Sequence, residues 1–146
     1  LNFRLTNLQA ALGCAQFEKM SEIFEARKRV YLMYREMLAS IDGIELQEYR
    51  PEVTPVVWVI AVKLSTNQYP QGRDGVMDEM KSLNIETRPG FYPPSAMEHI
   101  YTVKDVDIPH SILLGGAIVC LPSSPNITNH TIDYVCNSII GLRKKT

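Results

Sequence analysis

Arg88, Phe91 and Tyr92 are residues whose types and spacing suggest a binding site. Arg88 stands at the end of a short strand-like run, where Pro89 stops the strand and an aromatic-rich loop follows. A guanidinium in this position can capture a carboxylate or phosphate, and the two aromatic rings can cover a sugar or a base. The alternatives are a solvated arginine at a strand end and aromatic rings that pack under their own loop.

Asn2 and Arg4 form a second candidate site, immediately before a capped helix. Two polar residues at alternate positions have no ordinary packing role there, and a guanidinium donates paired hydrogen bonds to anionic oxygens. The alternative is a turn in which the asparagine bonds to backbone and the arginine lies on the surface.

Charge and cysteine content exclude several classes of function. The chain carries 15 basic and 16 acidic residues, and the basic residues are scattered. We therefore expect no binding of nucleic acid.

The sequence has neither an apolar run of bilayer length nor a signal-peptide pattern, so we predict a cytoplasmic protein without a membrane partner. Cys14, Cys120 and Cys136 are widely spaced, which predicts reduced thiols, two of them in the core, and no metal site.

Apolar residues recur at helical spacing from Leu8 to Ile41. This pattern predicts one helix of roughly nine turns, about 50 Å long, capped by Thr6 or Asn7 and stopped by Asp42 and Gly43. The helix is too long for a small isolated domain. We accordingly divide the chain into a connecting helix, residues 1–42, and a small α+β domain, residues 43–146.

The second division contains short strands and amphipathic helices. A strand is expected at residues 56–64, with Trp58 in the core, and further short strands at 85–88 and 117–122. Helices are expected from about 72 to 83, from 108 to 114 before a Gly-Gly break, and after Thr128 as N-cap. The fold class is thus α+β: a small sheet with helices packed on one face and a long N-terminal helix leading into it.

Five stretches, taken in order, resemble a known family. They are NFRLTNLQAALGCAQFEK, ARKRVYLMYREML, the Trp-bearing strand, GRDGVMDEMKSLNIETRPGFYPP and LPSSPNIT. Together they resemble the C-terminal portion of the DegT/DnrJ/EryC1/StrS family, the pyridoxal-phosphate-dependent aminotransferases that act on nucleotide-linked keto sugars. The resemblance covers essentially the whole chain, and its N-F-R-L-T-N-x-Q-A-A-L-G run is the most specific part.

The resemblance implies a fold and a set of partners. The fold would be the small C-terminal domain of a fold-type I aminotransferase, leaving the large domain with the Schiff-base lysine outside this chain. The partners would be a nucleotide-diphosphate keto sugar, an amino-acid amine donor, usually glutamate, and a second subunit of a homodimer. No lysine of this chain matches a cofactor-lysine motif, so no catalytic residue is assigned and the chain alone is expected to be inactive.

The resemblance also implies roles for the candidate residues. Asn2 would reach the cofactor phosphate of the opposite subunit, with Arg4 beside it, and Arg88, Phe91 and Tyr92 would bind substrate. The loop after Arg88 departs from the family pattern, because it has a second proline and lacks a histidine. The alternative function is a stand-alone α+β module that binds a ligand or mediates dimerisation without catalysis.

Overall fold

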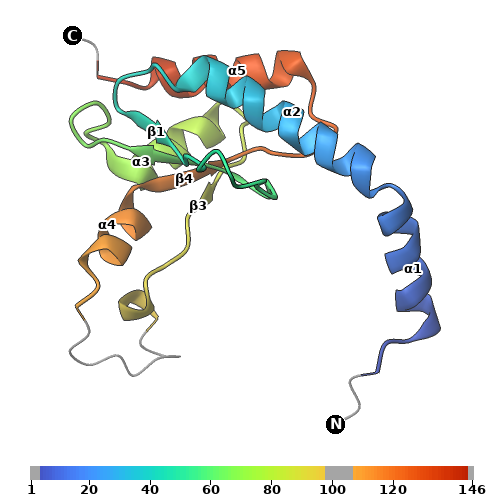
Figure 1. The fold of residues 1–146 in the computed structure, drawn as a ribbon. Helices are drawn as coiled ribbons and strands as arrows, with labels where there is room; N and C mark the ends of the chain where they lie inside the picture. The colour runs from blue at the N-terminus through green and yellow to red at the C-terminus, as the bar shows by residue number, and fades with distance from the viewer. Residues whose placement is uncertain (1–3, 98–106, 145–146) are drawn as a thin grey trace.

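The computed structural model describes residues 4–97 and 107–144. Two helices lead into a small sheet, and three more helices are spaced between and after its strands (Figure 1). The helices are α1 Asn7–Glu18, α2 Met20–Leu38, α3 Gly72–Ser82, α4 Pro109–Ala117 and α5 Asn129–Gly141. The strands are β1 Ile44–Leu46, β2 Ile60–Leu64, β3 Arg88–Pro89 and β4 Ile118–Leu121, and a single 3-10 turn spans Pro94–Ala96.

The four strands form an antiparallel sheet in the order β1-β2-β4-β3. Ile60, Val62 and Leu64 of β2 are buried, whereas Ala61 and Lys63 between them are only half-buried. This alternation is expected of a sheet that is covered on one face. The predicted α+β class, with helices packed on one face, is therefore confirmed.

Helices α2, α3 and α5 supply the other half of the core. Their buried side chains join those of β2 and β4 in one cluster; they are Val30, Tyr34, Leu38, Val76, Met80, Ile132, Val135, Cys136 and Ile139. Thr128 caps α5 by accepting a hydrogen bond from the Thr131 N–H, as predicted. Two of the three cysteines are expected in the core, but only Cys136 is fully buried; Cys120 is half-buried and Cys14 is exposed.

The single long helix predicted for the N-terminal region is wrong. The chain breaks at Lys19, whose φ and ψ are −99° and 8° and whose N–H bonds back to the Gln16 and Phe17 carbonyls. Helix α1 then bends away from α2 and lies off the sheet (Figure 1), and none of its residues is buried. Thr6 and Gln9 form a capping box at its start, which settles the N-cap in favour of Thr6. No helix in the described ranges is long and apolar enough to cross a membrane.

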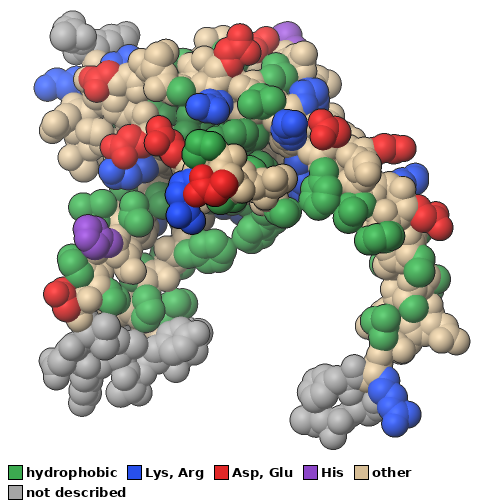
Figure 2. All heavy atoms as spheres, in the orientation of Figure 1, with side chains coloured by type: hydrophobic (Ala, Val, Ile, Leu, Met, Phe, Trp, Pro, Cys, Tyr) green, Lys and Arg blue, Asp and Glu red, His purple; other side chains and the backbone are tan. Residues whose placement is uncertain are grey.

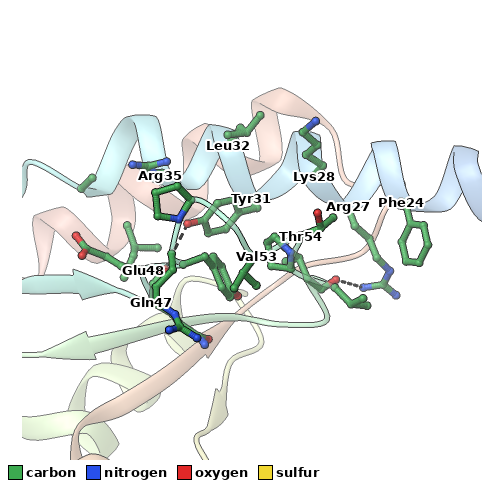
Figure 3. Close-up of a pocket in the computed structure, with 18 of the residues that line it drawn as sticks. Phe24, Arg27, Lys28, Tyr31, Leu32, Arg35, Gln47, Glu48, Val53 and Thr54 are labelled. Carbon is green, nitrogen blue, oxygen red and sulfur yellow. Dashed lines mark hydrogen bonds between the residues drawn. The ribbon is translucent and has the colours of Figure 1, made fainter.

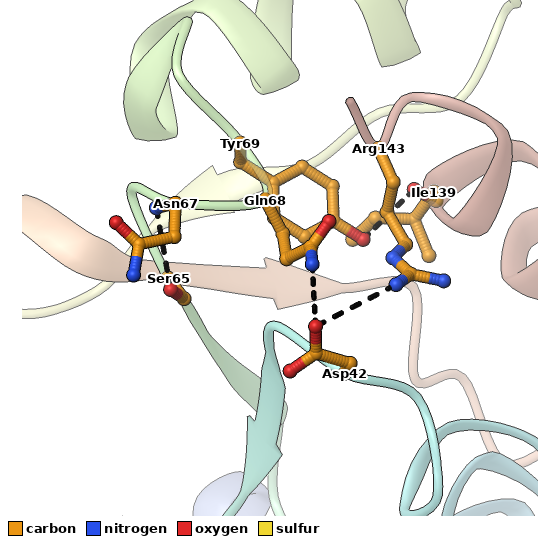
Figure 4. A network of polar contacts seen from close by, with 7 residues as sticks. All are labelled: Asp42, Ser65, Asn67, Gln68, Tyr69, Ile139 and Arg143. Atoms are coloured by element: carbon orange, nitrogen blue, oxygen red, sulfur yellow. Dashed lines mark hydrogen bonds and ion pairs between the residues drawn. The ribbon is translucent and has the colours of Figure 1, made fainter. Parts of the chain in front are cut away.

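The turn from α2 into β1 is tied to the end of α5 (Figure 4). Gln68 donates a side-chain hydrogen bond to Asp42, and the Arg143 guanidinium lies 3.9 Å from the same carboxylate. Gly43 next to it has φ +86°, and a Cβ there would collide with the Gln68 side chain, so the turn requires glycine. The division into residues 1–42 and 43–146 stays a prediction, although α2 shares its core with the sheet.

Candidate functional site

A groove of about 390 Å³ lies against the open face of the sheet. It is lined by residues 58–59, 86, 88–91 and 120–124, together with Arg27 of α2. Strand β3 pairs with β4 so that Arg88 is directly opposite Cys120, and both strands end at this groove. Two of the predicted substrate residues, Arg88 and Phe91, are therefore brought together.

Trp58 lies in this groove and not in the core, so its predicted burial is wrong. Its side chain is 63% exposed, whereas its neighbour Val57 is buried at 6%. Val57 and Ile60 are both buried although they are three residues apart, so the alternation of β2 does not continue through residues 57–59, and Trp58 faces outward. The Trp58 ring centroid lies 6.2 Å from that of Phe91, with an interplanar angle of 41°.

The Trp58 backbone is held from two sides. Arg27 Nη1 donates to the Trp58 carbonyl at 3.1 Å, and Ser123 Oγ donates to the same oxygen at 3.2 Å. Arg27 comes from α2 and Ser123 follows β4, so the Trp58 backbone is fixed by two elements that belong to the core assembly. Neither Arg27 nor Ser123 was identified from the sequence, because their partner is a backbone carbonyl.

Arg88 extends from the groove into solvent. Its side chain is 80% exposed, and its Nη2 lies 3.5 Å from Glu86 Oε1, whose side chain is 84% exposed. Such an exposed ion pair contributes little free energy, so an anionic ligand can replace the carboxylate at small cost. Arg88 is thus an exposed cation at the edge of the groove, and its substrate role stays a prediction.

Tyr92 does not line the groove. Its ring lies under the guanidinium of Arg73, 5.8 Å from the ring centroid to Cζ, and Arg73 also donates to the Gly115 carbonyl and to Asp74. The hydrogen bond with Arg73 lowers the pKa of the Asp74 carboxyl. Tyr92 therefore packs against Arg73 of α3, which itself bonds to α4.

Asn2 lies outside the described residues. Arg4 is exposed, just before the N-cap of α1, and it does not contribute to the groove. The structure therefore separates Arg4 from the groove residues, and the cofactor roles of both residues stay predictions.

A larger cavity of about 1130 Å³ separates α2 from residues 47–57 (Figure 3). Tyr31 of α2 points toward this segment, donates to the Gln47 carbonyl at 3.3 Å and meets the Tyr49 ring edge-on, with centroids 5.6 Å apart. Burial and the nearby Tyr31 raise the pKa of Tyr49. The charged residues around the cavity have both signs; they are Glu25, Arg27, Lys28, Arg35, Glu45, Glu48 and Arg50. The lining therefore favours no particular ligand charge.

The chain belongs to the DegT/DnrJ/EryC1/StrS aminotransferase family, which it matches over residues 1–140. It is 28% identical over 138 residues to GDP-perosamine synthase of Escherichia coli O157:H7, a match covering 94% of this chain and 36% of that enzyme. It is 32% identical over 138 residues to GDP-perosamine synthase of Caulobacter vibrioides, covering 92% of this chain and 36% of that enzyme.

A solved structure has the same fold. The putative sugar aminotransferase Spr1654 of Streptococcus pneumoniae, in its PLP form, superposes with a TM-score of 0.84 at 15% sequence identity, covering 95% of this chain and 36% of that one. In each comparison the chain spans little more than a third of the length of the protein that it matches.

The groove does not provide the lysine that a complete site for pyridoxal phosphate requires. The cofactor needs a lysine for its covalent attachment, and no lysine is found among the residues that line the groove. Lys63, on the open face of the sheet, is held by Glu45 through a 2.8 Å ion pair.

Burial raises the pKa of the Cys120 thiol, so this groove residue is a poor nucleophile. Within the described ranges no cluster of His, Cys, Asp and Glu could hold a metal ion.

Proposed function

We propose that this chain forms the small domain of a pyridoxal-phosphate-dependent aminotransferase that transfers an amino group, with glutamate as donor, to the keto group of a nucleotide-diphosphate sugar. Family membership and the similarity to GDP-perosamine synthases support the reaction class. The observation that carries the proposal to this chain is the groove, where an exposed guanidinium lies beside two exposed aromatic rings.

The groove residues bind substrate in this proposal. Arg88 contacts a phosphate or carboxylate oxygen, and Phe91 covers a ring of the substrate. The cofactor supplies the amino-transfer chemistry when bound. Its lysine anchor and most of its phosphate cradle would lie in the part of the relatives that this chain does not cover. The chain alone is therefore expected to transfer no amino group.

The N-terminal segment completes the proposed assembly. Asn2 and Arg4 are proposed to contact the cofactor phosphate across a homodimer interface. Helix α1 exposes Leu8, Leu12 and Phe17 at 82%, 65% and 72%, and hydrophobic side chains follow the inner side of the arch that α1 makes with the rest of the molecule (Figure 2). An apolar surface of this kind fits a helix that connects to a large domain and packs against it.

The exposed face of α1 also favours the alternative function, a stand-alone module that dimerises or binds a ligand without catalysis. The two functions differ in one respect that can be measured. A small domain restores amino transfer when it is joined to the rest of a family member, whereas a stand-alone module does not.

The test replaces the matched segment of the E. coli GDP-perosamine synthase with residues 1–146 of this chain. We expect the chimera to transfer an amino group from glutamate to the GDP-linked keto sugar. Arg88→Gln should raise KM for the sugar nucleotide about 10- to 100-fold, the usual effect of removing a hydrogen bond to a charged group. Arg50→Gln is the matched control, because Arg50 is 81% exposed and pairs with Glu52 outside the groove.

The chain alone supplies the second arm of this test. It is incubated with pyridoxal phosphate and glutamate, reduced with borohydride and analysed by mass spectrometry. A chimera that binds cofactor but transfers no amino group would contradict the proposed reaction. A stoichiometric adduct at one lysine of the chain alone would contradict its proposed inactivity.

A further inference from the structure

We infer that Trp58 and Phe91 form the surface on which the base of the nucleotide sugar stacks, with the neighbouring phosphate on Arg88; this inference rests on the proposed function. Both rings are largely uncovered, Trp58 at 63% and Phe91 at 81%. Aromatic rings that stay exposed inside a groove are suited to base stacking, since every base presents a π-face.

The geometry of the Trp58 and Phe91 rings leaves room for a planar ring of the ligand. Their planes are inclined at 41°, and their centroids are 6.2 Å apart, so they touch without covering each other face to face. Because the rings are tilted, a planar ligand can lie on one of them and contact the edge of the other. The groove's volume of about 390 Å³ is at the small end for ligand sites, which fits one ring system and an adjacent phosphate.

Trp58 is held in place before any ligand arrives. Its carbonyl accepts hydrogen bonds from Arg27 and Ser123, at 3.1 and 3.2 Å, and the preceding Val57 is buried in the core. A ring whose backbone is already fixed loses less conformational freedom on binding, which strengthens binding.

Phe91 is placed by the close approach of its loop to β4. The Gly90 N–H donates to the Ile118 carbonyl at 3.0 Å, and a Cβ on Gly90 would come within 2.8 Å of the Ile118 side chain. Glycine thus lets residue 90 lie against β4 and brings Phe91 beside Trp58. Arg88, two residues before Gly90, supplies the positive charge for the phosphate that the ribose of the nucleotide carries.

Trp58 is the only tryptophan of the chain, so its indole N–H gives one identifiable resonance in a proton–nitrogen correlation spectrum. The ¹⁵N-labelled chain is titrated separately with guanosine, GDP, mannose 1-phosphate and pyrophosphate. We expect guanosine and GDP to shift the indole resonance with millimolar affinity. Mannose 1-phosphate and pyrophosphate should leave it in place.

Variants separate stacking from charge. Phe91→Ala should weaken GDP and guanosine about 5- to 100-fold, the range found when a stacking ring is removed. Arg88→Gln should weaken GDP about tenfold and leave guanosine unchanged. Val56→Ala is the matched control, since Val56 is 70% exposed two residues before Trp58 and outside this groove. The inference is overturned if no base-containing ligand moves the resonance, or if mannose 1-phosphate moves it as strongly as GDP.

The chimera distinguishes this inference from the proposed function. Trp58→Leu should raise KM for the sugar nucleotide about tenfold with kcat unchanged, and Trp58→Phe should restore KM because it keeps a stacking ring. If the chimera is active and Trp58→Leu leaves its KM for the sugar nucleotide unchanged, base stacking is refuted and the proposed amino transfer is still supported. A chimera that binds cofactor but transfers no amino group, alongside a GDP-shifted indole in the chain, refutes the reaction and leaves stacking supported.

Discussion

Tyr34 and Tyr31 lie one helical turn apart on α2 in different surroundings. Tyr34 is completely buried and its hydroxyl donates to the Pro122 carbonyl at 2.8 Å. Burial raises the pKa of Tyr34, so the phenol stays neutral over the ordinary pH range. Tyr31 is half-buried, and its hydroxyl donates to the Gln47 carbonyl at 3.3 Å in an exposed position. The two residues therefore form a matched pair for measuring what a buried hydroxyl contributes.

Tyr34→Phe should lower the free energy of unfolding by about 1–3 kcal/mol, because it leaves the half-buried Pro122 carbonyl without its hydrogen-bond partner. Tyr31→Phe should cost less than about 1 kcal/mol, since water can replace its hydroxyl. Urea unfolding of both variants measures the difference. Equal losses would mean that burial of the Tyr34 hydrogen bond contributes nothing to stability.

Among the elements, helices α1 and α2 differ most in the interactions that stabilise them. Helix α2 contributes Val30, Tyr34 and Leu38 to the core, whereas α1 buries no residue and is joined to α2 at Lys19. The stability of α1 thus depends on its capping box and its own backbone hydrogen bonds, and isolated helices of this length are marginal in water.

In the monomeric chain, below the concentrations at which it self-associates, we expect the amide protons of α1 to exchange with solvent much faster than those of α2, because α1 can open without disturbing the core. Thr6→Ala should destabilise α1 by about 0.5–2 kcal/mol and leave the global unfolding free energy unchanged. Hydrogen exchange followed by mass spectrometry measures both effects. Thr128→Ala, which removes the cap of the core helix α5, is the contrasting variant and should lower global stability. Slow exchange throughout α1 would show that the helix is covered by a partner.

Elements with strong local signals could be predicted, and those defined by their neighbours could not. Helices α3 and α5 and strand β4 were anticipated because caps, turns and apolar periodicity mark them. Strand β1 has three residues and owes its conformation to pairing with β2, so no pattern within it was sufficient. The break at Lys19 carries no glycine or proline to mark it.

The candidate site shows the same limit. Arg88 and Phe91 were named from the sequence because proline and glycine mark the turn between them. Trp58 was expected in the core, since Val57 and Trp58 are both apolar and a one-residue shift in an extended chain exchanges the two faces. The alternation of β2, with Ile60, Val62 and Leu64 inward, would place Trp58 inward as well. The chain leaves this alternation in residues 57–59, which precede the strand, and Val57 is buried in place of Trp58.

At the scale of the whole molecule, the exposed apolar residues of α1 predict self-association of the chain at micromolar concentration. A surface of this kind normally finds a partner when its natural cover is absent. The double substitution Leu8→Glu and Leu12→Glu should weaken the association at least tenfold, since it places charge on the contact. Val53→Glu, at an exposed apolar residue far from α1 in the sequence, is the control. Light scattering gives the mass, and a monomer at these concentrations would contradict the prediction.

The strand order has a consequence for how the chain acquires its structure. The central pair joins Ile60 to Leu121, and the cluster that contains Val30 is completed by Ile132 and Val135 of α5. These contacts link residues far apart in the sequence, and closing such long loops slows folding because their entropy is lost before the contacts form. A ribosome must release nearly all of the last helix before the core can close. Until then Val30 and its neighbours on α2 are open to chaperones.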